Sequence, residues 1–388
     1  MSARDFDLVL FGATGFTGGL TADYLARHAP AGTRWALAGR SEAKLGAVRD
    51  RLAALDPALA QLPLLVADVT DAAALAGIAS RTRVLITTVG PYLTHGEPLV
   101  QACADAGTDY VDLTGEPEFV DLMYLRHHAR AVETGARLVH ACGFDSIPHD
   151  LGAWYAVQQL GPDSPIRLRG VVRASGQPSG GTVHSALTAM SRGRQMREAL
   201  SRRREKEPRP VGRRSRAVAG KPHRDAVLGY WLLPLPTIDP FIVARSGASL
   251  ADYGPDFRYS HYAGIKTLPY VVGGVAGVGA IAVAAQVPFL KGLLLDRIKQ
   301  GEGPSQERRD ASWFRVDFVG ESGGRQVHTR VSGGDPGYTE TAKMLAESAL
   351  CLAFDDNPTS SGQVTTAVAM AANLTARLQA AGMLFEVL

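Results

Sequence analysis

A glycine-rich loop near the N-terminus has the residue spacing of a phosphate-binding turn. It reads Gly12-Ala13-Thr14-Gly15-Phe16-Thr17-Gly18, a GxxGxxG pattern that follows an apolar run and precedes a helical pattern. Glycines at this spacing let the backbone approach a pyrophosphate, and the free N–H groups of a helix N-terminus stabilise its negative charge. The sequence therefore predicts a dinucleotide site, contacted by Gly12, Thr14, Gly15, Phe16 and Gly18.

A second group of residues would distinguish NADP from NAD. At the end of the second strand, an NAD site usually carries an acidic residue on the ribose 2′-hydroxyl. This chain has Arg40 and Ser41 at that point, and an arginine can pair with the 2′-phosphate of NADP. We therefore expect NADP, while the nearby Glu42 leaves NAD open. Asp68, after the third strand, would either bind the adenine amino group or cap a helix.

Side chains that could move protons follow the fourth, fifth and sixth expected strands. The loop Val89-Gly90-Pro91 would border the nicotinamide, and Tyr92 follows it directly. Glu116 comes after the fifth strand, and Asp145 and His149 come after the sixth. Phenol, carboxyl and imidazole groups are common general acids and bases, but each is also common in structural roles. Tyr92, Asp145 and His149 are the candidate catalytic residues, and Asp145 could equally cap a helix.

These residues need a sheet that brings the ends of several strands together. Over residues 1–150, short β-rich apolar runs alternate with helical patterns, which predicts a parallel sheet with crossover helices. Six strands make a doubly wound Rossmann domain, whose ligands bind at the carboxyl ends of the strands. The expected strands are 7–11, 35–38, 62–67, 84–89, 110–113 and 137–141.

The rest of the chain predicts a second domain and a returning tail. Residues 151–335 read as an inserted α+β domain for substrate binding or dimerisation, with a hairpin turn at Gly323-Gly324. Residues 336–388 contain two amphipathic helical patterns that we expect to pack on the Rossmann domain. The predicted fold class is therefore α/β, a Rossmann domain with an inserted α+β domain and a C-terminal segment that returns to the first. A length of 388 residues suits two or three packed domains.

The charge of the chain is strongly uneven. Of its formal net charge of +3, the stretch from Arg192 to Arg224 contributes +10, from 13 Arg and Lys against 3 Glu, so the remainder carries −7. The run from Arg202 to Arg216 would be a mobile solvated loop or would bind acidic lipid or an acidic carrier protein. Nucleic acid is not an expected partner, because no aromatic residue is interleaved for base stacking. The 3 cysteines are too few and too scattered for a cysteine-rich zinc site, so no metal is expected.

An apolar segment bears on localisation. The 24 residues from Thr267 to Leu290 carry no formal charge, but prolines and glycines interrupt them. Three interpretations stay open: a spanning helix, a membrane-surface or lipid-facing element, and a buried or homodimer-interface helix. We expect contact with an apolar ligand or with the membrane surface. Since the N-terminus lacks a signal-peptide pattern, the predicted location is the cytoplasm, with peripheral contact at the inner face of the cell membrane.

Several motifs taken together resemble one family. The runs GATGFTG, AGRS, TTVGPY, AGTDYVDLTGE, ACGFDSIPHDLG and GDPGYTETAKML are similar to those of the saccharopine dehydrogenase-like oxidoreductases. Within that family, the chain is most similar to the bacterial trans-acting enoyl reductases, which serve a polyketide synthase in complex lipid synthesis. The resemblance implies an NADPH-dependent oxidoreductase that reduces an α,β-unsaturated acyl thioester. Its partners would be a lipid-like acyl substrate and an acidic carrier domain of the synthase.

Two other functions stay open on the sequence. One is a saccharopine-type amino-acid dehydrogenase, which would need cationic residues within the cleft for a dicarboxylate substrate. The other is a dinucleotide-binding, membrane-associated adaptor without turnover, favoured by the absence of a convincing acid and base pair. Turnover of NADPH with an enoyl thioester separates both from the enoyl reductase.

Overall fold

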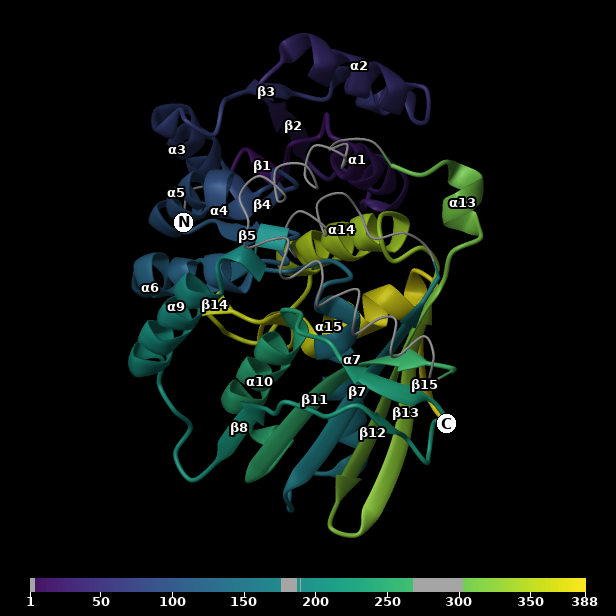
Figure 1. Cartoon of the computed structure of the whole chain (residues 1–388). Coiled ribbons are helices and arrows are strands. Elements are labelled where there is room, and N and C mark those ends of the chain that lie inside the picture. Colours follow the sequence, from purple (N-terminus) through teal and green to yellow (C-terminus); the bar gives the residue numbers. More distant parts are fainter. Residues whose placement is uncertain (1–3, 176–186, 189, 268–302) are drawn as a thin grey trace.

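Two β-sheets, one parallel and one mixed, organise the chain in the computed structural model (Figure 1). The structure describes residues 4–175, 187–188, 190–267 and 303–388. The predicted α/β fold with a Rossmann domain and a second domain is confirmed. The two sheets lie at opposite ends of the molecule, with helices between them and around the first sheet (Figure 1).

The first sheet is entirely parallel and has the order β14-β6-β5-β4-β1-β2-β3. Its strands are β1 (Phe6–Phe11), β2 (Trp35–Gly39), β3 (Leu64–Val66), β4 (Thr82–Thr87), β5 (Asp109–Val111), β6 (Arg137–Val139) and β14 (Gly362–Val364). The helices along this part of the chain are α1 (Phe16–His28), α2 (Glu42–Ala53), η1 (Pro57–Gln61), α3 (Ala72–Ser80), α4 (Tyr92–His95), α5 (Glu97–Ala106), α6 (Pro117–Thr134) and α7 (Ile147–Leu160). β1, β2 and β4 are almost wholly buried, as expected for continuous apolar runs in a sheet covered on both faces.

The second sheet is mixed and has the order β15-β13-β12-β7-β11-β10-β9, with β8 also paired to β11. Its strands are β7 (Ile166–Ala174), β8 (Arg214–Ala217), β9 (His223–Arg224), β10 (Trp231–Pro234), β11 (Asp256–Ile265), β12 (Phe314–Ser322), β13 (Arg325–Gly333) and β15 (Leu384–Val387). Helices α9 (Gly193–Lys206), α10 (Asp239–Ser249), η2 (Ala251–Tyr253) and α13 (Gln306–Asp310) belong to the same region. The expected hairpin is β12–β13, and both Gly323 and Gly324 have positive φ in its turn.

The C-terminal segment contributes to both sheets. Helix α14 (Thr339–Phe354) contacts α1 and β4, and helix α15 (Thr366–Ala380) contacts α14 and α7. Strand β14 extends the parallel sheet beside β6, and β15 pairs with β13 in the second sheet. The sequence patterns predicted neither strand, because three or four residues are too few to show a period. The tail therefore connects the two sheets.

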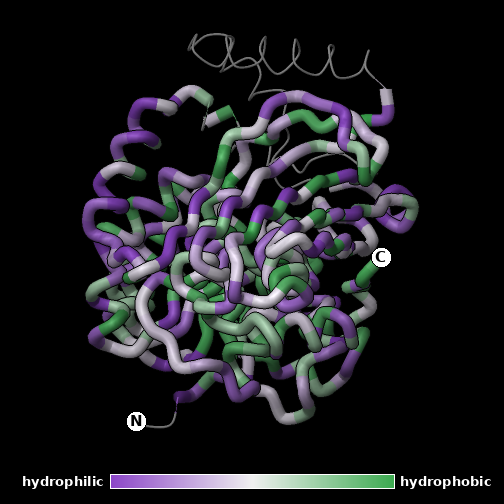
Figure 2. The backbone as a smooth tube through the Cα atoms, turned by 90° about the horizontal axis from the view of Figure 1, so that it is seen from below, coloured by the Kyte–Doolittle hydropathy of each residue, from purple (hydrophilic) through white to green (hydrophobic). Residues whose placement is uncertain are grey.

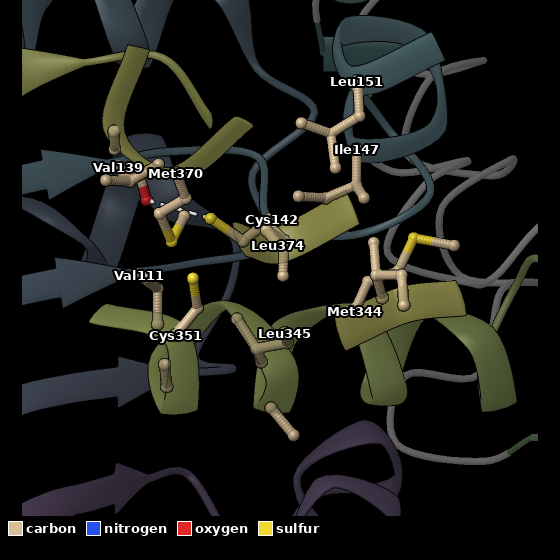
Figure 3. Packing of buried hydrophobic residues seen from close by; sticks show 14 of the residues in the cluster. Val111, Val139, Cys142, Ile147, Leu151, Met344, Leu345, Cys351, Met370 and Leu374 are labelled. Carbon is tan, nitrogen blue, oxygen red and sulfur yellow. Dashed lines mark hydrogen bonds between the residues drawn. The ribbon is translucent and has the colours of Figure 1, made fainter. Parts of the chain in front are cut away.

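A continuous hydrophobic core lies between the sheets. Helices α7, α14 and α15 lie between them in Figure 1, and one buried cluster contains residues of both sheets and of these three helices. Figure 3 shows its centre, where Val111 and Val139 of the parallel sheet face Cys351 of α14 and Met370 of α15. Hydrophilic residues are prominent along the outer turns in Figure 2, with hydrophobic ones concentrated towards the middle. The core thus holds the two sheets in one arrangement.

The Arg-rich stretch from Arg192 to Arg224 is folded: it forms α9 and the strands β8 and β9, and α9 packs against α6. The mobile loop predicted for the run from Arg202 to Arg216 is therefore wrong, since α9 extends to Lys206 and β8 begins at Arg214. Arg192 pairs with Glu118 of α6 at 2.6 Å, and Arg203 pairs with Asp121 of α6 and is 3% exposed. Ion pairs with acidic residues of α6 therefore fix the positions of Arg192 and Arg203.

The apolar segment was assigned to residues 267–290, and all of it beyond Thr267 lies outside the described residues. Within the described ranges, no helix combines the length and the apolar character that a bilayer crossing requires. Membrane contact and a homodimer through this segment stay predictions.

Candidate functional site

The glycine-rich loop joins β1 to α1 and packs closely on the loop after β4. Gly12 has a φ of +90°, and a Cβ there would lie 2.8 Å from Thr88 Oγ1. A Cβ at Gly18 would lie 2.1 Å from the carbonyl oxygen of Gly12, a distance that no real side chain shows. The Thr88 hydroxyl donates a hydrogen bond to that same carbonyl at 3.1 Å. Gly12 and Gly18 are thus required by backbone packing.

Gly15 has a different environment. It precedes α1, and no side chain caps the N–H groups of this helix end. A Cβ at Gly15 would meet only the carbonyl oxygen of Gly12, at an ordinary distance of 3.5 Å, and both Thr14 and Gly15 are exposed. The next residue, Phe16, is covered by the ring of Tyr338, 5.0 Å away between centroids. The exposed, uncapped helix start is suited to an anion.

Arg40 and Asp68 lie side by side at the ends of β2 and β3, which pair in register through Gly39 and Val66. The Arg40 side chain is 79% exposed, and its Nε lies 3.8 Å from Asp68 Oδ2. The other carboxylate oxygen of Asp68 accepts hydrogen bonds from Thr70 N and Oγ1, which lower the pKa of this carboxyl. The Arg40 guanidinium is therefore free enough to meet an anion at this edge of the sheet.

Ser41 has a local structural role. Its hydroxyl oxygen accepts a hydrogen bond from Lys44 N at 3.4 Å and so caps α2. Ser41 can cap α2 and still lie at the expected cofactor site, since it follows Arg40 directly. The structure thus keeps both residues at the edge where the adenosine half is expected.

Tyr92 is buried where the loops after β4 and β5 meet. The loop Val89-Gly90-Pro91 leads into it, and Val89 N–H donates to Thr87 Oγ1. The Tyr92 hydroxyl donates to Thr87 O at 3.2 Å and accepts from Leu113 N at 3.1 Å, and burial raises its pKa well above the ordinary value. These two backbone contacts occupy the hydroxyl. Tyr92 thereby joins the loop after β4 to the loop after β5. A catalytic role for Tyr92 stays a prediction.

Glu116 supports the same junction. Its two carboxylate oxygens accept hydrogen bonds from the backbone N–H groups of Tyr92 and Leu93, at 3.1 and 2.9 Å. An acidic group at this point satisfies donors that the short helix α4 leaves without partners. Glu116 therefore shapes the loop after β4.

Asp145 lies in the loop between β6 and α7 and is half-buried. Its Oδ2 would be 2.9 Å from a Cβ on Gly115, so the loop after β5 approaches it closely. Burial, and then the negative charge of Asp239, raise the pKa of Asp145 from 3.8 to about 7. A partly exposed carboxyl group that keeps its proton near neutral pH is suited to act as a general acid.

His149 lies in the first turn of α7 and is 2% exposed. Its Nδ1 is 3.0 Å from Asp239 Oδ1, and on the other side of Asp239 the Nε2 of His261 is 3.5 Å from Oδ2. Burial opposes the charge on Asp239, but the two neighbouring imidazoles hold the pKa of this carboxyl well below its usual range. Burial lowers the pKa of His261 to about 3. The structure thus joins His149 to two residues that the sequence patterns did not single out.

Weak signals for Asp239 and His261 exist in the sequence. Asp239 is the first residue of α10 and is followed by Pro240, a residue common in the first helical turn. On β11, Phe257, Tyr259 and His261 recur at every second position and are all buried. Neither pattern indicates chemistry by itself, and only the pairing of α7, α10 and β11 in space brings the side chains together.

Comparison with known proteins identifies the family. Residues 8–139 match the saccharopine dehydrogenase NADP binding domain. The chain is 40% identical over 411 residues to a protein of Mycobacterium tuberculosis (strain ATCC 25618 / H37Rv). This alignment covers 98% of this chain and 96% of the relative. It is 38% identical over 417 residues to the trans-acting enoyl reductase of Mycobacterium ulcerans (strain Agy99), covering 98% of this chain and 97% of that protein. The chain belongs to the saccharopine dehydrogenase-like family. Within it, its relatives are the trans-acting enoyl reductases.

A solved structure has the same fold. The apo saccharopine dehydrogenase (L-Glu forming) of Saccharomyces cerevisiae aligns with a TM-score of 0.54 and 12% sequence identity, over 98% of this chain and 99% of that one. This saccharopine dehydrogenase-like protein is therefore an NADP-dependent oxidoreductase, as its sequence predicted. The glycine-rich loop and its surroundings fit the cofactor. The uncapped start of α1, the exposed Gly15 and the exposed Arg40 lie along one edge of the parallel sheet.

Replacement of Arg40 should change the choice of cofactor. We expect Arg40→Ala to remove most of the preference for NADPH over NADH, because a charge-assisted contact with the 2′-phosphate contributes about 1.5 to 3 kcal/mol, roughly tenfold to a hundredfold in affinity. Fluorescence titration with both cofactors measures this. Arg81→Ala is the matched control, since Arg81, which follows α3, is also exposed but pairs with Asp5, which precedes β1. Equal affinity of the intact protein for NADPH and NADH would contradict the assignment.

Proposed function

We propose that the protein reduces the carbon–carbon double bond of an α,β-unsaturated acyl thioester with NADPH. The observation that carries this proposal is the similarity to enoyl reductases over 98% of the chain, which includes both sheets and the tail that connects them. The saccharopine-type alternative has support from the fold alone, at 12% identity.

The described residues supply one part of such a reaction. When bound, NADPH would supply the hydride for the β-carbon of the substrate. The α-carbon then needs a proton, and Asp145 is the candidate that combines partial exposure with a raised pKa. The proton passes from the Asp145 carboxyl group to the α-carbon, and the resulting carboxylate recovers a proton from solvent. The double bond becomes a single bond, and NADPH becomes NADP⁺.

The basic face of α9 is suited to an acidic carrier domain that delivers the thioester. Arg197, Arg202 and Arg204 are exposed on this helix, Arg194 is exposed but pairs with Glu198 at 2.9 Å, and Arg203 anchors the helix to α6. Opposite charges on two surfaces speed their encounter and fix their orientation. This cationic face supports a proposal of a polyketide synthase carrier as the partner.

Charge reversal on α9 tests the carrier. We expect Arg202→Glu to raise KM for an acyl chain bound to the carrier, because an attractive contact becomes repulsive, and to leave KM for a small pantetheine thioester unchanged. Steady-state kinetics with both substrates gives the comparison. An equal effect on the two substrates, or none on the carrier-bound one, would rule out α9 as the contact.

Turnover separates the three functions. Purified protein is incubated with NADPH and a trans-2-enoyl pantetheine thioester, NADPH absorbance is followed, and the product is identified by mass spectrometry. Stoichiometric formation of the saturated thioester supports the proposal. Oxidation of NADPH only with an amino acid and oxo-acid pair would indicate the saccharopine-type reaction. Tight binding of NADPH with no oxidation by either substrate would indicate an adaptor.

A further inference from the structure

Three side chains of the types that bind transition metals converge in the buried region between α7, α10 and β11. They are His149, Asp239 and His261, which are 2%, 2% and 4% exposed. One ligand atom from each lies within 4.8 Å of the other two. Helix α10 contacts both α7 and β11, and the three elements come from separate parts of the chain.

The imidazole of His149 has one nitrogen without the partner that a buried polar group normally has. Its Nδ1 lies 3.0 Å from Asp239 Oδ1, whereas its Nε2 makes no hydrogen bond within the described residues. Buried polar atoms are almost always paired, so each exception needs an explanation. The unpartnered Nε2 of His149 therefore calls for a ligand.

The separations agree with a shared metal ion. Zinc binds imidazole nitrogen and carboxylate oxygen at about 2.0 to 2.2 Å, so two ligands of a tetrahedral site are roughly 3.4 Å apart. Asp239 Oδ1 is 3.0 Å from His149 Nδ1, and Asp239 Oδ2 is 3.5 Å from His261 Nε2. All three ligand atoms lie within 4.8 Å of one another.

Surrounding groups orient the ligands. The Tyr259 hydroxyl is 3.0 Å from His261 Nδ1, which leaves Nε2 directed at Asp239. The hydroxyls of Thr237 and Ser146 donate to the two oxygens of Asp239, at 2.5 and 3.5 Å. Metal-binding imidazoles and carboxylates are typically held by such outer partners. The cluster therefore has the supporting shell of a built site.

We infer that His149, Asp239 and His261 form a binding site for a divalent zinc ion. Two imidazoles and one carboxylate suit zinc, whereas magnesium prefers oxygen ligands. This inference departs from the sequence-based expectation of no metal, which considered cysteine ligands, whereas these ligands are of a different kind. The inference does not depend on the proposed reaction, and the ion would link α7 to the second sheet through β11.

Zinc titration of the full-length protein tests the site. Protein stripped with a chelator and dialysed is titrated with Zn²⁺ against a chromophoric competitor, and we expect one equivalent to bind per chain. Tyr259→Phe keeps the ring but removes the hydroxyl, so it should weaken binding about tenfold to a hundredfold. His261→Gln should weaken it more. NADPH binding by each variant shows that it is folded, and Mg²⁺ is expected not to compete.

Two controls keep the assignment specific. His328→Gln removes a histidine that pairs with Asp317 at 2.8 Å in the β12–β13 hairpin, so it should leave zinc binding unchanged. X-ray absorption of the zinc-loaded intact protein should show nitrogen and oxygen ligands with the scattering of two imidazoles. Sulfur ligands would instead assign the zinc to Cys103, Cys142 or Cys351 and overturn the inference. So would the absence of stoichiometric zinc, or full retention of zinc by a folded His261→Gln variant.

Discussion

Gly15→Val is expected to abolish NADP binding while the protein stays folded. The φ of Gly15 is −79°, which valine tolerates, and a Cβ there meets protein only at 3.5 Å. The branched side chain would instead occupy the space in which a pyrophosphate approaches the start of α1. Loss of two charge-assisted hydrogen bonds, at about 1.5 to 3 kcal/mol each, corresponds to roughly a hundredfold or more in affinity.

Gly18→Val is the matched comparison. Its Cβ would lie 2.1 Å from the carbonyl oxygen of Gly12, so this variant should lose thermal stability as well as cofactor binding. Calorimetric titration with NADPH and thermal melting of both variants separate the two effects. Undiminished binding by Gly15→Val would show that the loop is a structural turn and that the cofactor lies elsewhere.

Asp145→Asn is expected to lower kcat by about 10² to 10⁴, the usual contribution of a general acid, with little change in NADPH affinity. For the intact enzyme, kcat should fall as pH rises above about 7, because the proton on Asp145 is then lost. The kcat of the Asp145→Asn variant should not show this decrease above pH 7. A chelator is present in both assays, since a cation in the cluster of His149 would lower the pKa of Asp145.

The stability of this variant provides an independent check. The folded-state pKa of Asp145 is raised from 3.8 to about 7, so the folded protein retains a proton that the unfolded chain releases. The stability from this group is fully present below pH 3.8 and is lost as pH rises to about 7. At pH 8 the intact protein must bury an ionised carboxylate at position 145, which lowers its stability. Asparagine has no charge to bury, so Asp145→Asn should melt at a higher temperature than the intact protein at this pH. If instead its activity and its melting temperature both fell, Asp145 would be a structural residue.

The sequence by itself determined the Rossmann domain and its cofactor. The loop from Gly12 to Gly18 and the placement of Arg40 are local features, in which the residue types and their spacing carry the physical requirement. The β12–β13 hairpin is local in the same way, because Gly323 and Gly324 supply the positive φ of its turn. Such features need few contacts from distant parts of the chain.

Other features depend on contacts between distant residues, and only the tertiary structure decided them. β14 has three residues and becomes a strand because the backbone of β6 pairs with it. The Arg-rich stretch is ordered by acidic groups of α6, about 80 positions earlier in the chain, as with Arg203 and Asp121. Neither partner is visible from the local pattern.

The roles of the titratable residues were decided in the same way. Tyr92, Asp145 and His149 are similar candidates in the sequence, since each follows a strand of the parallel sheet. In the fold, backbone groups occupy the Tyr92 hydroxyl, Asp145 is half-buried with a raised pKa, and His149 faces Asp239 and His261. The sequence determines which groups are available, but burial and neighbouring charge set their protonation, and both arise only when the two sheets pack together.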